Sequence, residues 1–212
     1  MVVIAGGSGF LGQKLVKWLE HAGHQVRILT RQTAAGAGRI TWQPDGTAGS
    51  LPQHLEGVDA VVNLAGENIA ARRWSAKQKA LLRSSRILPT RTLASAIAQC
   101  ERPPRVFVSA SGVGYYGSRG DEPVTEETPP GSDFFGRLCV DWEQEARAVE
   151  STTRLIIVRS APVLSPDGGA LKPMLLPFKL GLGATLGSAT QYFPWVHIDD
   201  WTALVMWMIG ND

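Results

Sequence analysis

The first twelve residues constrain the fold more than any other part of the chain. An apolar run, Val2–Ala5, leads directly into three glycines spaced three apart, Gly6, Gly9 and Gly12. This is the glycine fingerprint in the context that it requires, a strand that ends in a tight turn and opens a helix. Glycine lets the backbone approach a pyrophosphate, whose charge the exposed N–H groups and the helix dipole stabilise. The segment therefore predicts a dinucleotide site made by Gly6, Gly7, Ser8, Gly9, Phe10, Leu11 and Gly12.

Short β-branched runs alternate with segments of helical period along the rest of the chain. The runs that we expect to form strands are Val2–Ala5, Gln25–Thr30, Arg39–Trp42, Ala60–Leu64, Arg105–Ser109 and Leu155–Arg159. Such alternation predicts an α/β fold with a doubly wound parallel sheet of the Rossmann type. Since 212 residues suffice for one main domain, we expect residues 1–160 to form a dinucleotide-binding Rossmann domain. Residues 161–212 are then expected to begin a substrate-binding or cap region, with the final helix contributing to the Rossmann domain.

Glycine and proline set two of the expected helix boundaries. Leucines recur at helical spacing after the glycine loop, and Gly23 is expected to stop that helix. A second helical stretch runs from Ser75 to Cys100 but contains Pro89, which removes a backbone donor. We therefore expect two helices in that stretch.

Polar residues mark the starts of two later helices. Ser132 or Asp133 is expected to cap a helix with one apolar face, and Asp199 or Asp200 is expected to cap the last helix. His197 and the two aspartates lie at a strand-to-helix junction, where successive side chains point in different directions, so no metal site is expected. Pro, Gly and long apolar residues dominate residues 162–187, a mixture typical of a segment that covers a ligand.

Composition excludes several classes of partner. The net charge of +2 comes from 21 basic and 19 acidic residues with no basic run, so nucleic acid is not an expected partner. No apolar stretch approaches the roughly 18 residues of a membrane span, so no membrane association is expected. A strand that begins beside Met1 leaves no room for a signal peptide, and we expect a cytoplasmic protein. Cys100 and Cys139 lack a CxxC partner and are expected to be reduced, mostly buried thiols.

The end of the second strand bears on the choice of cofactor. Sites selective for NAD place an acidic residue on the ribose hydroxyls roughly 20 residues beyond the glycine loop. This sequence has Thr30 and Arg31 there instead. Arginine offers a planar, permanently charged donor to a 2′-phosphate, and threonine adds a hydroxyl. The pair favours NADP(H) over NAD(H), so the Rossmann domain of residues 1–160 is expected to be NADP(H)-binding.

Landmarks spread over nearly the whole chain are shared with a known group of proteins. Beyond the glycine loop they are Asn63-Leu64-Ala65-Gly66, Gly66-Glu67-Asn68-Ile69, Arg73-Trp74, Ser85-Arg86, Gly114-Tyr115-Tyr116-Gly117, Pro166-Asp167-Gly168-Gly169, Leu180-Gly181-Leu182-Gly183 and the run from Gln191 to Asp200. With them the chain resembles the extended short-chain dehydrogenase/reductase superfamily and, more narrowly, its atypical YfcH-type epimerase family. Members of that family continue through a C-terminal substrate-binding segment. The resemblance therefore implies that this sequence is truncated after Asp212.

The resemblance also implies a set of cofactor contacts. They are Gly6 through Gly12, Thr30, Arg31, Leu64, Ala65 and Arg86, with Val163 beside the nicotinamide. From the residues alone, Arg86 would be a helix-surface arginine and Val163 a core residue. The implied partner is a small-molecule substrate, with a nucleotide sugar as one candidate, and a homodimer is one candidate assembly.

The catalytic pattern of the superfamily is broken in this sequence. That pattern uses a Tyr as acid/base and a Lys four residues later, and the matching positions hold Phe135 and Cys139. Phe cannot donate a proton, and Cys carries no positive charge to assist a neighbour. The remaining catalytic candidates are Ser111, as a hydroxyl that orients the substrate, and Tyr115 or Tyr116 as a substitute acid. A substitute acid would need a cationic neighbour, for which Arg137 is one candidate.

Three hypotheses follow for the chain as a whole. The first hypothesis is an NADP(H)-dependent oxidoreductase or epimerase-like enzyme acting on a carbonyl or hydroxyl of a small molecule. The alternative, motivated by the loss of Tyr and Lys, is a non-catalytic NADP(H)-binding regulatory or sensor protein. A structural Rossmann domain with an empty site ranks third, because the glycines and Arg31 argue against it.

Overall fold

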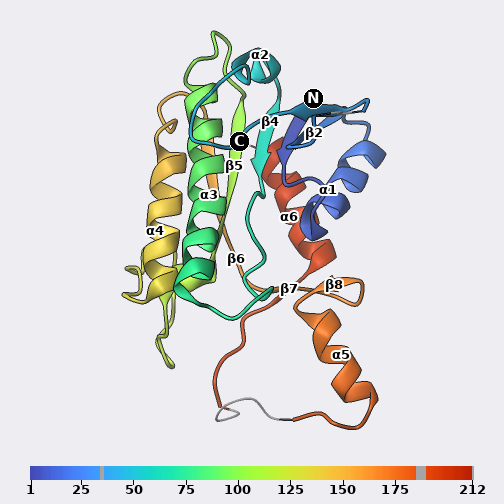
Figure 1. Ribbon diagram of the computed structural model, residues 1–212, viewed down its shortest axis with the longest axis vertical. Coiled ribbons are helices and arrows are strands. Elements are labelled where there is room, and N and C mark those ends of the chain that lie inside the picture. Colours follow the sequence, from blue (N-terminus) through green and yellow to red (C-terminus); the bar gives the residue numbers. More distant parts are fainter. Residues whose placement is uncertain (34–35, 185–189, 212) are drawn as a thin grey trace.

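The predicted strands pair into one parallel sheet in the computed structural model, which describes residues 1–33, 36–184 and 190–211 (Figure 1). The sheet has the order β3-β2-β1-β4-β5-β6. Its strands are β1 Val2–Ala5, β2 Val26–Thr30, β3 Arg39–Thr41, β4 Ala60–Asn63, β5 Val106–Gly112 and β6 Arg154–Ser160. This is the strand order of the Rossmann fold, in which the chain reverses direction across the sheet between β1 and β4. The carboxyl ends of these strands therefore meet at one edge, where such folds bind their ligands.

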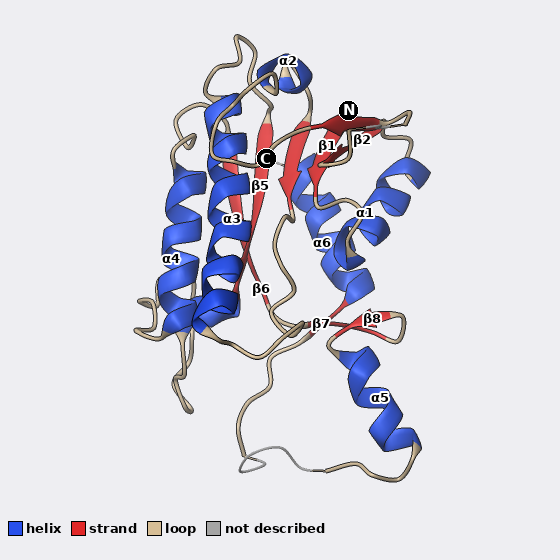
Figure 2. Cartoon of the chain, viewed as in Figure 1, coloured by secondary structure: helices blue, strands red, loops and turns tan. Residues whose placement is uncertain are grey.

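Helices cover both faces of this sheet (Figure 2). The helices of the described residues are α1 Phe10–His21, α2 Pro52–Leu55, α3 Ala76–Ile97, the 3-10 helix η1 Val113–Tyr116, α4 Phe134–Arg147, α5 Leu171–Lys179 and α6 Ile198–Gly210. Helices α3 and α4 pack together on one face, and α1 and α6 pack together on the other. Val3 and Ala5 of β1 belong to the first core, whereas Val2 and Ile4 belong to the second. Burial on both faces explains why the central strands are continuously apolar.

The predicted boundaries hold to within a few residues at most elements. Strand β1 lies where it is predicted, and Gly23 ends α1 through hydrogen bonds from Gly23 N to Glu20 O and from His24 N to Leu19 O. Strand β5 runs three residues beyond its predicted end at Ser109, because its pairing with β6 continues to Gly112.

The expectation of two helices around Pro89 is wrong, because α3 is one continuous helix. Proline in a helix interior costs about 3 kcal/mol by removing a hydrogen bond and crowding the previous turn. Buried contacts of the next residue offset that cost. Thr90 Oγ1 donates to Arg86 O at 2.7 Å and accepts from Asn63 Nδ2 and Trp142 Nε1, each at 2.8 Å. Tertiary hydrogen bonds thus hold the helix to β4 and α4 beside the proline.

The two predicted helix caps have different outcomes. Asp133 caps α4 as expected, accepting from Gly136 N at 2.7 Å. The expected cap of α6 by Asp199 or Asp200 is wrong, because His197 is the N-cap and its Nδ1 accepts from Asp199 N at 3.3 Å. His197 is the last extended residue, so both aspartates fall in the first helical turn, where their charge complements the helix dipole.

The segment after β6 forms a small second sheet and an exposed helix. Strands β7 Val163–Ser165, β8 Gly168–Gly169 and β9 Val196–His197 pair in the order β8-β7-β9. Helix α5 lies beyond this sheet, away from the main one (Figure 1). It and the residues after it expose the apolar side chains of Met174, Leu176, Phe178, Leu180 and Leu182. Residues 185–187, the last of the segment 162–187, lie outside the described residues. None of the helices in the described part of the chain is long and apolar enough to cross a membrane.

Candidate functional site

The glycine loop joins β1 to α1 at the carboxyl edge of the sheet. Gly6 has a φ of +79°, and a Cβ there would lie 2.6 Å from Leu64 O. A Cβ on Gly12 would lie 2.3 Å from Gly6 O and 2.5 Å from Gly7 Cα. Side chains at both positions are therefore incompatible with this turn, which brings the backbone of the loop against the start of α1.

The start of α1 is open to an anion. Its N-cap is Gly9, no side chain caps the helix, and its first turn holds no acidic residue. The first N–H groups of the helix, from Phe10 onward, therefore have no capping side chain as acceptor. Ser8 and Gly9 are exposed, and a Cβ on Gly168 would lie 2.5 Å from the Phe10 ring, which packs beneath the β8 turn. The loop has the geometry of a phosphate site at a helix N-terminus.

Thr30 is the last residue of β2, the strand next to β1, and Arg31 follows it directly. Thr30 Oγ1 accepts from Gln32 N at 3.2 Å, which fixes the turn after the strand. Arg31 is exposed, and its guanidinium has no hydrogen-bond or ion-pair partner within the described ranges. A free cation thus lies at the strand end where dinucleotide folds bind the adenosine ribose.

Leu64 and Ala65 follow β4 on the other side of β1. Leu64 N donates to Ala5 O at 2.9 Å, and Ala65 N donates to Asn63 Oδ1 at 3.2 Å. Arg86 reaches this turn from α3 and donates through Nη2 to Glu67 O at 2.9 Å.

Arg86 is half-buried, unlike the surface arginine that its helical position predicts. Its guanidinium lies 5.3 Å from the Trp142 ring centroid, and burial lowers the pKa of Arg86 below its usual value. Val163 begins β7 and is 8% exposed, so its side chain belongs to the core.

Phe135 and Cys139, at the positions of the superfamily's catalytic Tyr and Lys, pack against other parts of the protein. Phe135 packs edge-on against Trp74, with ring centroids 4.6 Å apart, in the first turn of α4. Cys139 is buried one turn later, with its Sγ 3.8 Å from Gly112 O. An aromatic ring and a buried thiol therefore occupy the places of the missing acid and cation.

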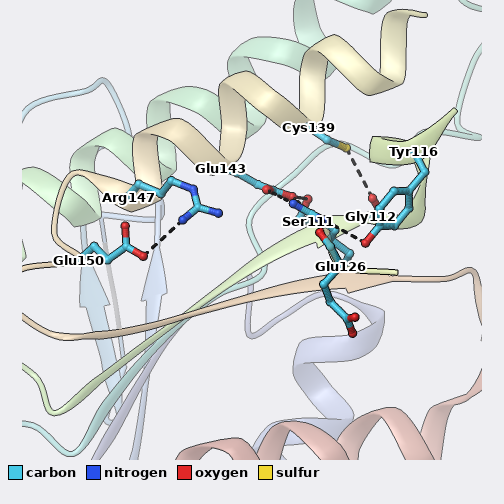
Figure 3. Close-up of polar contacts among 9 residues, drawn as sticks. Ser111, Gly112, Tyr116, Glu126, Cys139, Glu143, Arg147 and Glu150 are labelled. Atoms are coloured by element: carbon cyan, nitrogen blue, oxygen red, sulfur yellow. Dashed lines mark hydrogen bonds and ion pairs between the residues drawn. The ribbon is translucent and has the colours of Figure 1, made fainter. Parts of the chain in front are cut away.

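Ser111 and Tyr116 are instead joined by two charged residues that the sequence patterns did not single out. Ser111 Oγ donates to Glu143 Oε1 at 2.7 Å, and Arg159 Nη1 donates to Tyr116 Oη at 2.9 Å. Figure 3 shows Ser111, Tyr116 and Glu143 converging from β5, η1 and α4. Arg159 lies near the carboxyl end of β6, after a run of apolar residues. A charged residue at that end of a strand is the sequence signal by which Arg159 could have been found.

The expectation that Arg137 is the cation beside the tyrosines is wrong. Arg137 donates to Ser132 O at the exposed start of α4. Arg159 takes that place, because β6 pairs with β5 and carries its last residues beneath η1. A groove of about 1360 Å³ opens beside Tyr116 and Arg159 and is lined also by Arg119, Arg147 and Leu204.

Both cysteines are free thiols, and both should resist alkylation in the folded chain. Burial raises the pKa of the Cys100 thiol to about 11 and also raises the pKa of Cys139. Because the thiolate is the reactive form, iodoacetamide at about pH 8 should label Cys100 about 100-fold more slowly than an unstructured cysteine peptide. Mass spectrometry of samples quenched over time measures this rate, with urea-unfolded chain as the control. Labelling of the folded chain at the unfolded rate would contradict the burial argument.

Sequence comparisons relate the chain to epimerase-like proteins. The profile of the "NAD dependent epimerase/dehydratase family" matches residues 2–212. The chain is 45% identical over 202 residues to the epimerase family protein SDR39U1 of Bos taurus, covering 94% of this chain and 66% of that protein. Against the epimerase family protein Mb2239 of Mycobacterium bovis, the identity is 44% over 202 residues, with the same coverage of 94% and 66%. The chain thus spans 66% of the length of these relatives.

Two solved structures resemble the whole described chain. The human epimerase family protein SDR39U1 (isoform 2), crystallised with NADPH, matches with a TM-score of 0.89 at 40% identity, over 99% of this chain and 70% of that one. The nucleoside-diphosphate sugar epimerase of Corynebacterium glutamicum gives a TM-score of 0.86 at 34% identity, over 99% and 43%. Both similarities extend from the glycine loop through the segment after β6.

Proposed function

Since the chain belongs to the NAD-dependent epimerase/dehydratase family, we propose that it is an NADP(H)-dependent oxidoreductase or epimerase-like enzyme. Its substrate in this proposal is the carbonyl or hydroxyl group of a small molecule, with a nucleotide sugar as the leading candidate. The observation that carries the proposal is the uncapped, glycine-lined start of α1 together with the guanidinium of Arg31, which has no partner among the described residues. A pyrophosphate and a 2′-phosphate are the groups that these two features fit.

The residues present fit this cofactor. A Cβ at Gly6 or Gly12 would clash with backbone atoms of the turn, so glycine is what lets the loop close tightly enough to aim its backbone at a pyrophosphate. The first N–H groups of α1 would hold the pyrophosphate, Thr30 and Arg31 the 2′-phosphate, and Leu64 and Ala65 the adenosine side. NADP(H) supplies hydride transfer when bound. The crystallisation of the human relative with NADPH supports the choice of NADP(H) over NAD(H).

Substrate groups would be handled at the carboxyl end of β5. Ser111 is hydrogen-bonded to Glu143, and Tyr116 is hydrogen-bonded to Arg159, so two hydroxyl groups lie beside one ion pair. Phe135 and Cys139, in contrast, supply neither a proton nor a charge. The name of the Corynebacterium neighbour supports a nucleoside-diphosphate sugar as the substrate class.

Arg31→Asp should weaken NADPH binding and leave NADH binding nearly unchanged. A charge-assisted contact to the 2′-phosphate is worth about 1.5 to 3 kcal/mol, so the dissociation constant for NADPH should rise about 10- to 100-fold. Titration by nicotinamide fluorescence measures both cofactors. Arg27→Asp changes an exposed arginine of β2, the strand that Arg31 follows; it is the matched control and should bind NADPH like the wild type. Equal affinity of the wild type for NADPH and NADH would contradict the role of Arg31.

A non-catalytic NADP(H)-binding sensor is the second candidate, favoured by Phe135 and Cys139 at the usual catalytic positions. Oxidation of NADPH separates the two candidates. The wild type would be assayed with nitrobenzaldehyde, phenanthrenequinone and a UDP-linked keto sugar as carbonyl probes. Turnover with any of them supports the enzyme, whereas tight NADPH binding without turnover supports the sensor.

A further inference from the structure

A buried ion pair organises the polar groups around β5. Arg159 donates to Glu143 through two nitrogens, Nε to Oε1 and Nη2 to Oε2, each at 2.8 Å. The Glu143 side chain is 4% exposed and that of Arg159 is 16% exposed, so water screens the pair weakly. Ser111 Oγ donates to the same carboxylate at 2.7 Å. Strands β5 and β6 and helix α4 are thereby tied together at one carboxylate.

The same guanidinium contacts both tyrosines of η1, but in different ways. Its carbon lies 3.5 Å from the centroid of the Tyr115 ring, which makes Tyr115 a stacking platform. Arg159 Nη1 donates to Tyr116 Oη at 2.9 Å and also to Glu126 O at 3.0 Å. The hydrogen bonds with Glu143 raise the pKa of Arg159 above its usual value, so the guanidinium keeps its charge.

The Tyr116 hydroxyl therefore accepts a hydrogen bond from Arg159, and its own hydrogen is not used in that contact. No acceptor for that proton occurs among the residues that the structure describes, and Tyr116 lines the groove beside Arg159. A neighbouring cation stabilises the negative charge that a phenol oxygen gains when it gives up a proton. The Tyr115 hydroxyl makes no such hydrogen bond within the described part of the chain, and its ring is covered by the guanidinium.

Resting on the proposed function, we infer that Tyr116 is the proton donor of this site and that Arg159 supplies the cation that the position of Cys139 lacks. Glu143 is a positioning residue that holds Arg159 in place. In the reaction, the phenolic O–H bond of Tyr116 breaks and its proton forms an O–H bond with the substrate carbonyl oxygen. Bound NADPH would supply the hydride for the carbonyl carbon and be oxidised to NADP⁺, so that the C=O bond would become single. The phenolate, held by Arg159, regains a proton from water.

Two kinds of measurement test this assignment. The first is NADPH oxidation with the carbonyl probes above, compared among the wild type, Tyr116→Phe, Tyr115→Phe and Tyr192→Phe. Loss of the Tyr116 hydroxyl should lower turnover about 100-fold or more, as removal of a general acid does. Tyr115→Phe keeps the stacked ring and should lower turnover less than fivefold, and Tyr192→Phe is the control for an exposed tyrosine of the groove. NADPH affinity should be unchanged in all three variants.

The second measurement does not depend on turnover. The chain has three tyrosines, so a sample labelled with carbon-13 at the tyrosine Cζ gives three resonances, which the three Phe variants assign. Glu143→Gln keeps the size of the side chain but removes its charge, and it should loosen the contact between Arg159 and Tyr116. The Tyr116 resonance should then move, while that of Tyr192 stays in place.

The possible outcomes separate this inference from the proposed function. Turnover by the wild type that survives Tyr116→Phe would overturn the assignment of Tyr116 and leave the proposed function intact. A Tyr116 resonance that does not move in Glu143→Gln would overturn the positioning role of Glu143. Tight NADPH binding with no turnover of any probe would overturn the proposed function and the proton donor with it. The inference would be supported by three results together: turnover is lost in Tyr116→Phe, turnover is retained in Tyr115→Phe, and the Tyr116 resonance moves in Glu143→Gln.

Discussion

Gly12→Ala is expected to abolish NADPH binding at concentrations that saturate the wild type. The added Cβ would lie 2.3 Å from Gly6 O and 2.5 Å from Gly7 Cα, and both neighbours are backbone atoms that cannot rotate away. The turn must open, which moves the N–H groups at the start of α1 out of their common direction. Two lost charge-assisted hydrogen bonds, at about 1.5 to 3 kcal/mol each, correspond to an affinity loss of about 1,000-fold. Overpacking should also lower the free energy of unfolding by about 1 to 3 kcal/mol.

Gly210→Ala is the matched control for this variant. A Cβ on Gly210 meets no atom within 4 Å, and the residue lies at the end of α6, away from the loop. Fluorescence titration should give wild-type NADPH affinity, and urea unfolding should give wild-type stability or slightly more. If Gly12→Ala bound NADPH within threefold of the control, the glycine loop would not be the phosphate site.

Glu143→Ala should be among the most destabilising single changes in the chain. It leaves the Arg159 guanidinium and the Ser111 hydroxyl without their carboxylate partner in a site where Arg159 is only 16% exposed. Breaking a buried ion pair in this way costs about 3 to 5 kcal/mol. The free energy of unfolding, measured in urea by tryptophan fluorescence, should fall by that amount.

Two further variants decide whether burial is the cause. Glu150→Ala breaks the ion pair with Arg147, whose side chains are 58% and 44% exposed, and should cost less than about 1 kcal/mol. The double change Glu143→Leu with Arg159→Met removes both charges and should recover most of the loss, because no buried charge is left alone. A loss in Glu150→Ala as large as in Glu143→Ala would show that burial does not set the cost.

The fold was predictable because its signals are local. The run Val2–Ala5 and the glycines after it specify a strand, a turn and the start of a helix, all from neighbouring residues. Pro89 shows the limit of that reasoning, since a propensity argument splits α3 while contacts of Thr90 with β4 and α4 keep it whole. His197 shows another, because the cap of α6 depends on where the preceding strand ends.

The candidate site divides along the same line. Thr30, Arg31 and Leu64 could be placed at the carboxyl ends of strands because Thr30 ends β2 and the other two each directly follow a strand in the sequence. Glu143 and Arg159 lie 16 residues apart on different elements, and their pairing depends on how α4 lies across β5 and β6. Periodicity fixes the buried face of α4 but not the partner that a charge on that face will meet. Sequence reasoning therefore points to Arg137, which is nearer in sequence to the tyrosine pair, and not to Arg159.

The hydrogen bond from Ser111 to Glu143 limits what Ser111 can recognise. A serine hydroxyl carries one hydrogen, and here the carboxylate of Glu143 takes it at 2.7 Å. Toward a ligand, Ser111 then offers only lone pairs, whereas the Tyr116 hydroxyl, which accepts from Arg159, offers a hydrogen. A molecule bound by both side chains must present an O–H or N–H to the serine and a bare oxygen to the tyrosine. The two hydroxyls thus fix which group of the ligand lies at each side chain. In the reverse orientation, the bare oxygen of the ligand would face the lone pairs of Ser111.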